Sequence, residues 1–392
     1  MAVLLPNGID IDDAPLSLKG RVLLLSSGYD GGLYTQLVAG GCFVNQVKIK
    51  EGLLYDQDAL TAVTPQEGTT SLVAVGGTGI LDCAKVLSAR YALPLYLVPT
   101  CYAGAATNRW ALTMGREIKE WQAQPYEVRM LPAQLAHANR LDAAETYAYA
   151  LQCYLHGVAT VTSNWLEGRE EANSGLLAAM TQLDGVLTAV GGYTTEAAKT
   201  LWEGILAISR YLPDEIPEGH YLSWLISLYK GGQIIYNKYR FAAAFAVGVA
   251  LSLAPDTPDL TLPADRVRTA KGMAGMPIPR WKDELMLEHV WQDYRQDVAD
   301  LLRGLPRYAR NWRRMVGNCG YGFYEDLGTE DLVRGLRETC HLTKRYSSLC
   351  HLYREGWLDD KGERYGSQAN QVVFDGHGRD GISGQTGHPR RV

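Results

Sequence analysis

The segment Val73-Ala-Val-Gly-Gly-Thr-Gly-Ile-Leu-Asp-Cys-Ala-Lys85 carries the strongest signal for the fold of this chain. The apolar run from Ser71 to Val75 is typical of a buried parallel strand, and a helical pattern begins near Ile80. Between them, a glycine turn lets the backbone approach a phosphate and directs N–H groups and the positive end of a helix at the anion. Such turns also serve as plain connections, so this segment alone leaves phosphate binding open.

A second apolar strand, Leu95-Tyr-Leu-Val98, follows the helix and leads into a loop of small residues. The loop reads Pro99-Thr-Cys-Tyr-Ala-Gly-Ala-Ala-Thr-Asn108. Ligands of α/β sheets bind beyond the carboxyl ends of the strands, which is where this loop begins. The loop therefore extends the candidate site of the glycine turn.

The order of these motifs resembles the superfamily of iron-containing alcohol dehydrogenases, glycerol dehydrogenases and dehydroquinate-synthase-like enzymes. The features that carry the resemblance are Gly-Gly-Thr-Gly at 76–79, Asp82 and Lys85 one turn apart, and the strand with its small-residue loop. They cover roughly residues 20–160. The resemblance implies an α/β N-terminal nucleotide-binding domain and an all-helical C-terminal domain, with the active site in the cleft between them.

The pattern of elements agrees with this fold class. Strands are expected at 21–26, 42–49, 71–75 and 95–98, with helices near 33–38, 56–63 and 80–91. Their alternation predicts a parallel sheet with helices on both faces. A hairpin over 110–121 and a short strand at 128–131 follow. Helical patterns then dominate, at 142–155, 176–187, 194–211, 220–236, 241–253, 282–302 and 329–355. We expect domains at 1–138 and 139–360 and a loosely structured tail at 361–392.

Composition indicates a soluble globular enzyme. Of 392 residues, 46% are hydrophobic and 21% are charged, and the net charge of −5 argues against a generic nucleic-acid binder. Seven scattered cysteines fit a reducing compartment, and neither a signal peptide nor a long apolar segment is evident. We therefore expect a cytoplasmic protein with a small-molecule substrate and no membrane or nucleic-acid partner. The resemblance implies a homo-oligomer.

Cofactor contacts follow from the resemblance. It implies that Gly76, Gly77 and Thr78 hold the diphosphate of NAD or NADP, with Asp82 as a further candidate close by. For Asp82 and Lys85 the simpler interpretation is a solvated i,i+3 pair on the helix.

Three residues outside the glycine turn are also candidate cofactor contacts. Thr100 and Thr107 could contact the nicotinamide or its ribose, or they could close turns. Asp30 could accept hydrogen bonds from a ribose, although an Asp before Gly-Gly is more often a turn residue.

The sequence departs from the resembled family at the residues that would bind a metal. The resemblance implies a divalent zinc or iron, held by one Asp and two or three His, that polarises the alcohol oxygen. Asp142 matches the first ligand, with a helix N-cap as its alternative role. No His lies between His220 and His289, and the expected His-Gly position falls near Phe241. One carboxylate does not hold a catalytic metal, so a metal site of the family type is in doubt.

Other side chains could take over the role of the metal. Lys238 or Arg240 could stabilise an oxyanion, or they could form a charged helix end in water. His156 and His220 could form a different metal site with Asp142.

Three functions remain open on this basis. The first is an NAD(P)-dependent oxidoreductase acting on a small polar alcohol or carbonyl compound, with Asp142 and Lys238 handling the proton or the oxyanion. The second is a catalytically silent nucleotide-binding relative that serves as a sensor or scaffold. A lyase of the sugar-phosphate-cyclase type ranks last, because its basic phosphate contacts are not found in the sequence.

Overall fold

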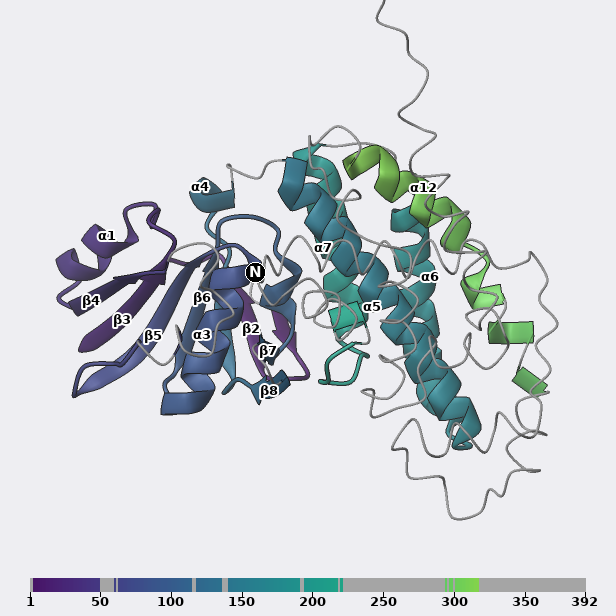
Figure 1. Cartoon of the computed structure of the whole chain (residues 1–392), viewed down its shortest axis with the longest axis horizontal. Coiled ribbons are helices and arrows are strands. Elements are labelled where there is room, and N and C mark those ends of the chain that lie inside the picture. The colour runs from purple at the N-terminus through teal and green to yellow at the C-terminus, as the bar shows by residue number, and fades with distance from the viewer. Residues whose placement is uncertain are drawn as a thin grey trace, which may run out of the picture.

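The computed structural model describes residues 3–49, 60, 63–114, 118–135, 140–190, 194–217, 219–220, 293–294, 296–298, 300 and 301–316. In this part of the chain, a twisted sheet with its helices occupies one side of the molecule and a group of long helices occupies the other (Figure 1). The combination of an α/β region and a helical region confirms the predicted fold class.

The main sheet has seven strands in the order β1-β2-β9-β6-β5-β3-β4. Their bounds are β1 Val3–Leu5, β2 Ile9–Asp12, β3 Arg21–Ser26, β4 Phe43–Lys48, β5 Thr69–Gly76, β6 Leu95–Pro99 and β9 Tyr126–Arg129. Every neighbouring pair is parallel except β1 and β2, which form an antiparallel hairpin. The strands predicted from apolar runs are confirmed, whereas the β1–β2 hairpin was not predicted.

Both faces of the sheet are buried at the inner strands β3 and β5, as the continuous apolar runs predict. Successive residues of β3 point to opposite faces, so Val22 and Leu24 belong to one hydrophobic core and Leu23 and Leu25 to the other. Helix α1 (Leu33–Ala39) contributes to the first core and helix α3 (Thr78–Tyr91) to the second. The prediction of helices on both faces is therefore confirmed.

The chain changes direction across the sheet between β3 and β5. After β3 it passes through α1 to β4 at the edge, and it then returns to form β5 on the other side of β3. Open α/β sheets bind ligands outside the carboxyl ends of strands at such a topological switch point. The fold thus singles out the segments that follow β3 and β5.

The helical region is arranged around one long helix. Helix α5 (Arg140–Leu166) has 27 residues and packs against α6 (Ser174–Ala189), α7 (Thr195–Ser209) and α12 (Leu305–Val316) (Figure 1). The sequence pattern ended this helix at Leu155, but the helix continues through Gly157. A Cβ at Gly157 would lie 2.9 Å from Met180 Sδ, so the glycine allows α6 to approach closely.

Smaller elements connect these two regions. Strands β7 (Trp110–Met114) and β8 (Ile118–Gln122) form the predicted hairpin, and they are followed, after β9, by the short helix α4 (Pro132–Leu135). The 3₁₀ turns are η1 (Gly104–Thr107) and η2 (Glu170–Asn173). No helix among the described residues is long and apolar enough to cross a membrane.

Several predicted segments lie wholly or mostly outside the described residues. They are the helices at 56–63, 220–236, 241–253, 282–302 and 329–355 and the tail at 361–392. The proposed domain limits stay predictions.

Candidate functional site

The carboxyl ends of three neighbouring strands bring the glycine turn and the small-residue loop together. Ser26, the last residue of β3, pairs with Val75 of β5, and Gly76 pairs with Pro99 at the end of β6. The backbone N–H of Thr100 donates to the Gly76 carbonyl at 3.1 Å. The glycine turn and the small-residue loop are therefore adjacent, and Thr100 is half-buried beside the turn. Its contact with a cofactor stays a prediction.

The glycine turn leads directly into α3. The helix begins at Thr78, slightly earlier than expected, and its N-cap Gly77 has extended backbone (φ −84°, ψ −172°) with no side-chain cap. The first N–H groups of a helix have no partner within the helix, and the helix dipole makes this end attractive to anions. The turn therefore has the features of a phosphate site.

The two glycines of this turn differ in what the fold requires of them. A Cβ at Gly76 would lie 2.8 Å from the Ile80 side chain, so this glycine is needed for α3 to pack against β5. A Cβ at Gly77 would meet only Cys101 Sγ, at 3.8 Å, which is an ordinary contact. Packing among the described residues therefore does not require glycine at position 77.

The interpretation of Asp82 and Lys85 as a solvated pair is wrong. Their exposed fractions are 1% and 0%, and Lys85 Nζ lies 3.1 Å from Asp82 Oδ1. The reason is that α3 packs against β5 on one side and against β7 and β8 on another, which leaves no wet face at these positions. The role of Asp82 in cofactor binding stays a prediction.

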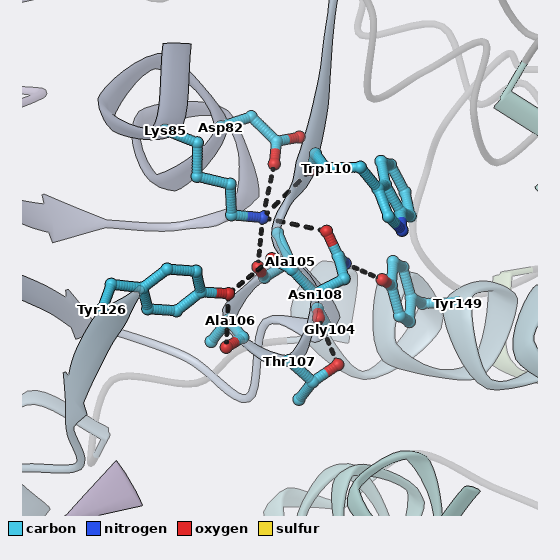
Figure 2. Close-up of polar contacts among 10 residues, drawn as sticks. All are labelled: Asp82, Lys85, Gly104, Ala105, Ala106, Thr107, Asn108, Trp110, Tyr126 and Tyr149. Carbon is cyan, nitrogen blue, oxygen red and sulfur yellow. Dashed lines mark hydrogen bonds and ion pairs between the residues drawn. The ribbon is translucent and has the colours of Figure 1, made fainter. Parts of the chain in front are cut away.

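Lys85 forms the centre of a buried polar network (Figure 2). Its ammonium group donates to the carbonyl of Ala105 at 2.5 Å, to Asn108 Oδ1 at 3.0 Å and to the carbonyl of Trp110 at 3.4 Å. A buried ammonium group is costly unless it is paired and hydrogen-bonded, and here Asp82 and the loop supply both. The lysine thereby ties α3 to the loop that follows β6.

The loop is closed by further hydrogen bonds. The Thr107 hydroxyl donates to the Gly104 carbonyl at 2.8 Å, so Thr107 does close a turn, as its alternative role predicted. Its contact with nicotinamide stays a prediction. The Tyr126 hydroxyl donates to the carbonyls of Ala106 and Asn108, and burial raises its pKa well above the usual value. Tyr126 is therefore a neutral donor that fixes the backbone of the loop.

Asp30 serves as a turn residue in this structure. Its Oδ1 accepts from the Gly32 N–H at 3.0 Å, and its Oδ2 accepts from Gln46 Nε2 at 2.8 Å. These bonds orient the turn between β3 and α1. A ribose contact at Asp30 stays a prediction.

Asp142 lies in the first turn of α5, which begins at Arg140, so Asp142 is not the N-cap that its alternative role required. His156 lies 14 residues further along the same helix, a separation of about 21 Å. His156 Nε2 is 3.7 Å from Glu215 Oε1. His220 packs edge-on against Trp110, with the two ring centroids 4.3 Å apart. Asp142 and His156 therefore do not share a site.

The described residues do not fit the metal of the family. Among them, no group of three or more His, Cys, Asp or Glu side chains is arranged to hold a metal ion. Lys238 and Arg240 lie outside the described residues.

Two residues of the network were not recognised in the sequence. Asn108 ends the small-residue loop, and its Nδ2 donates to the hydroxyl of Tyr149 on α5. The position of Asn108 in the loop was a usable signal. Tyr149 gave none, because its partner is far away in the chain. Gly104 belongs to the same contact, since a Cβ there would lie 2.2 Å from the Tyr149 ring.

Comparisons with known proteins find solved structures with a similar fold. No protein-family model and no curated protein matches the sequence. Among solved structures, sulfoacetaldehyde reductase from Bifidobacterium kashiwanohense in complex with NAD+ matches with a TM-score of 0.51 and 13% identity, over 89% of this chain and 92% of that chain. An iron-containing alcohol dehydrogenase matches with a TM-score of 0.50 and 13% identity, over 91% and 99%.

At this level of identity the likeness shows the fold and leaves the activity to be argued from the site. The resemblance found in the sequence is confirmed for the fold: the chain has a fold similar to that of a solved iron-containing alcohol dehydrogenase.

Proposed function

We propose that this chain is an NAD(P)-dependent oxidoreductase that acts on a small polar alcohol or carbonyl compound. The observation that carries the proposal is the Gly76-Gly77-Thr78 turn, which lies at the switch point of the sheet and at the N-terminus of α3. The likeness in fold to a reductase solved with NAD+ supports the same conclusion.

The residues of the turn suit a dinucleotide diphosphate. Gly77 has no side chain to keep the phosphate from the backbone, and the start of α3 offers N–H groups and a positive dipole. Thr100 and Thr107 border the loop on which we place the nicotinamide end. When bound, NAD(P)+ would accept a hydride from an alcohol carbon, and NAD(P)H would donate one to a carbonyl carbon.

We place the side chains that act on the alcohol proton and on the substrate oxygen in the helical region. Asp142 is our candidate for accepting the hydroxyl proton of an alcohol, because its helix is bonded to the cofactor loop one turn further on. There the Thr146 hydroxyl donates to the Tyr102 carbonyl at 2.9 Å. Lys238 is our candidate for stabilising the oxygen, and it rests on the sequence alone.

A catalytically silent nucleotide-binding protein is the second candidate. It is favoured by the absence of any His between His220 and His289, where the family resemblance places metal ligands. The same glycine turn would then bind a nucleotide without turnover. The two candidates share a binding site and differ only in chemistry.

Calorimetric titration with NAD+ and NADP+, followed by turnover assays, tests the proposal. The assays use small polyols, hydroxy acids and aldehydes and follow NAD(P)H absorbance with and without a chelator. We expect binding of one dinucleotide and turnover that survives the chelator. Binding without turnover would support the silent protein, and the absence of binding would refute both.

A pair of carboxyl variants then tests the role of Asp142. We expect Asp142→Asn to keep dinucleotide binding and to lose turnover. The exposed Asp297 provides the control, because Asp297→Asn removes a carboxylate from a helix surface and should leave both unchanged. Unchanged turnover in Asp142→Asn would remove Asp142 from the proposal.

A further inference from the structure

The loop of residues 102–110 is held by the helical region. Besides the bond from Thr146 of α5 to Tyr102, Trp202 Nε1 of α7 donates to the Ala103 carbonyl at 3.3 Å. These bonds bind the loop backbone to two helices. The loop is therefore held by the helical region as well as by the sheet.

Helix α3 holds the same loop through Lys85. The ammonium group has only donors, so it requires the Oδ1 of Asn108 and leaves Asn108 Nδ2 to donate to Tyr149. The exposed fractions of Lys85, Asn108 and Tyr149 are 0%, 7% and 4%. A continuous, buried chain of hydrogen bonds thus runs from α3 through the loop to α5 (Figure 2).

This chain of contacts has little freedom to rearrange. The Lys85 ammonium is bonded to a carboxylate and to several loop oxygens, and a buried ion of this kind is costly to separate from its partners. At the other end, Gly104 lies so close to the Tyr149 ring that no Cβ would fit between them. The contacts from α3 through the loop to α5 are therefore continuous and closely packed.

We propose that Lys85 is a positioning residue that couples dinucleotide binding to the start of α5. The diphosphate turn forms the N-terminus of α3, and Lys85 lies about two turns further along that helix. A diphosphate that fixes α3 therefore also fixes the loop and, through Asn108 and Tyr149, the first turns of α5, on which Asp142 lies. This inference rests on the proposed function, and it adds the route by which cofactor binding prepares the opposite side of the site.

Amide hydrogen exchange tests the coupling, with adenosine diphosphate ribose as the probe beside NAD+. This compound carries the diphosphate of NAD without the nicotinamide, so it cannot act on the loop through the nicotinamide ring. In the wild-type chain we expect either ligand to slow exchange in residues 140–149 by about fivefold or more, at the lower end of usual coupling between sites.

Tyr149→Phe is the decisive variant, because it removes one hydroxyl and keeps the ring against Gly104. We expect it to bind both ligands and to lose most of the slowing in residues 140–149, because the Thr146–Tyr102 bond still joins the loop to α5. Tyr154→Phe is the matched control on the same helix, since the Tyr154 hydroxyl donates to the Leu301 carbonyl at 2.7 Å and not to the loop. It should keep the slowing. Lys85→Met is less decisive, because it leaves the Asp82 carboxylate buried without its cation and is expected to destabilise the fold.

The outcomes separate this inference from the proposed function. Slowing in α5 that requires nicotinamide, or that is undiminished in Tyr149→Phe, would overturn the coupling through Lys85, Asn108 and Tyr149 while leaving dinucleotide binding intact. If calorimetry detects binding of neither ligand to the wild-type chain, the proposed function fails and the coupling fails with it.

Discussion

Replacing Gly77 by alanine should weaken cofactor binding and leave the stability of the fold almost unchanged. Gly77 has an extended backbone that any residue adopts, and its added Cβ would meet only Cys101 Sγ, at 3.8 Å. Alanine is a poorer N-cap than glycine by up to about 1 kcal/mol. The stiffer unfolded chain offsets this by about 0.4–1 kcal/mol. We expect the free energy of unfolding to change by less than about 1 kcal/mol.

The effect on the bound state is larger. A diphosphate held by backbone N–H groups approaches the turn closely, and a methyl group in its path forces a shift of the ligand or the turn. Overpacking of this kind costs about 1–3 kcal/mol. At about 1.4 kcal/mol for each tenfold change, the Kd for NAD+ should rise by about 5- to 150-fold.

Calorimetric titration with NAD+ and denaturant unfolding of the same samples provide the assay. Gly76→Ala is the control, because its Cβ would lie 2.8 Å from Ile80 and should lower the free energy of unfolding by about 1–3 kcal/mol without any ligand. A Gly77→Ala chain that binds NAD+ as tightly as the wild type would refute the reasoning. The diphosphate would then not lie on this turn.

Three further predictions concern the buried groups. Lys85→Met should lower the free energy of unfolding by about 3–5 kcal/mol, because it leaves a buried carboxylate without its cation. The exposed Lys199→Met should change it by less than about 0.5 kcal/mol in the same denaturation experiment. Gly104→Ala should cost about 1–3 kcal/mol, since its Cβ would overlap an aromatic ring of α5, whereas Gly185→Ala, in open space on α6, should gain about 0.5–1 kcal/mol. Burial raises the pKa of Tyr154 to about 12, above its unfolded value of about 10, so this one group should leave stability unaffected below pH 10 and lower it by about 2–3 kcal/mol between pH 10 and 12. A Tyr154→Phe chain that loses stability just as steeply over that interval in alkaline denaturation would contradict this assignment.

The sheet could be predicted because its signals are local. The apolar run of β5, the glycine turn and the helical pattern of α3 follow one another without interruption, and each is stronger than its alternatives. The β1–β2 hairpin lacked such a signal. Its strands are three and four residues long, and β2 is held by pairing with β9, which lies more than a hundred residues later.

The candidate site could be predicted only in part. The glycine turn and the loop after β6 are visible in the sequence because strands ending at the same edge of a sheet bring their loops together. The roles of Thr107 and Asp30 were open, since a hydroxyl or carboxylate in a loop can bond either to its own turn or to a ligand. In the structure both side chains bond to neighbouring protein groups.

The sequence by itself determined the order of the strands from β3 to β6 and the place of the glycine turn, because hydrophobic periodicity and glycine act over short stretches of chain. Only the tertiary structure decided that Asp82 and Lys85 are buried. Their spacing places them on one helix face whether that face is wet or dry. The β7–β8 hairpin and the loop of residues 102–110 bury that face, and they exclude the water that would otherwise solvate the pair. The ammonium group must then bond to the loop, because burial leaves it no solvent partners.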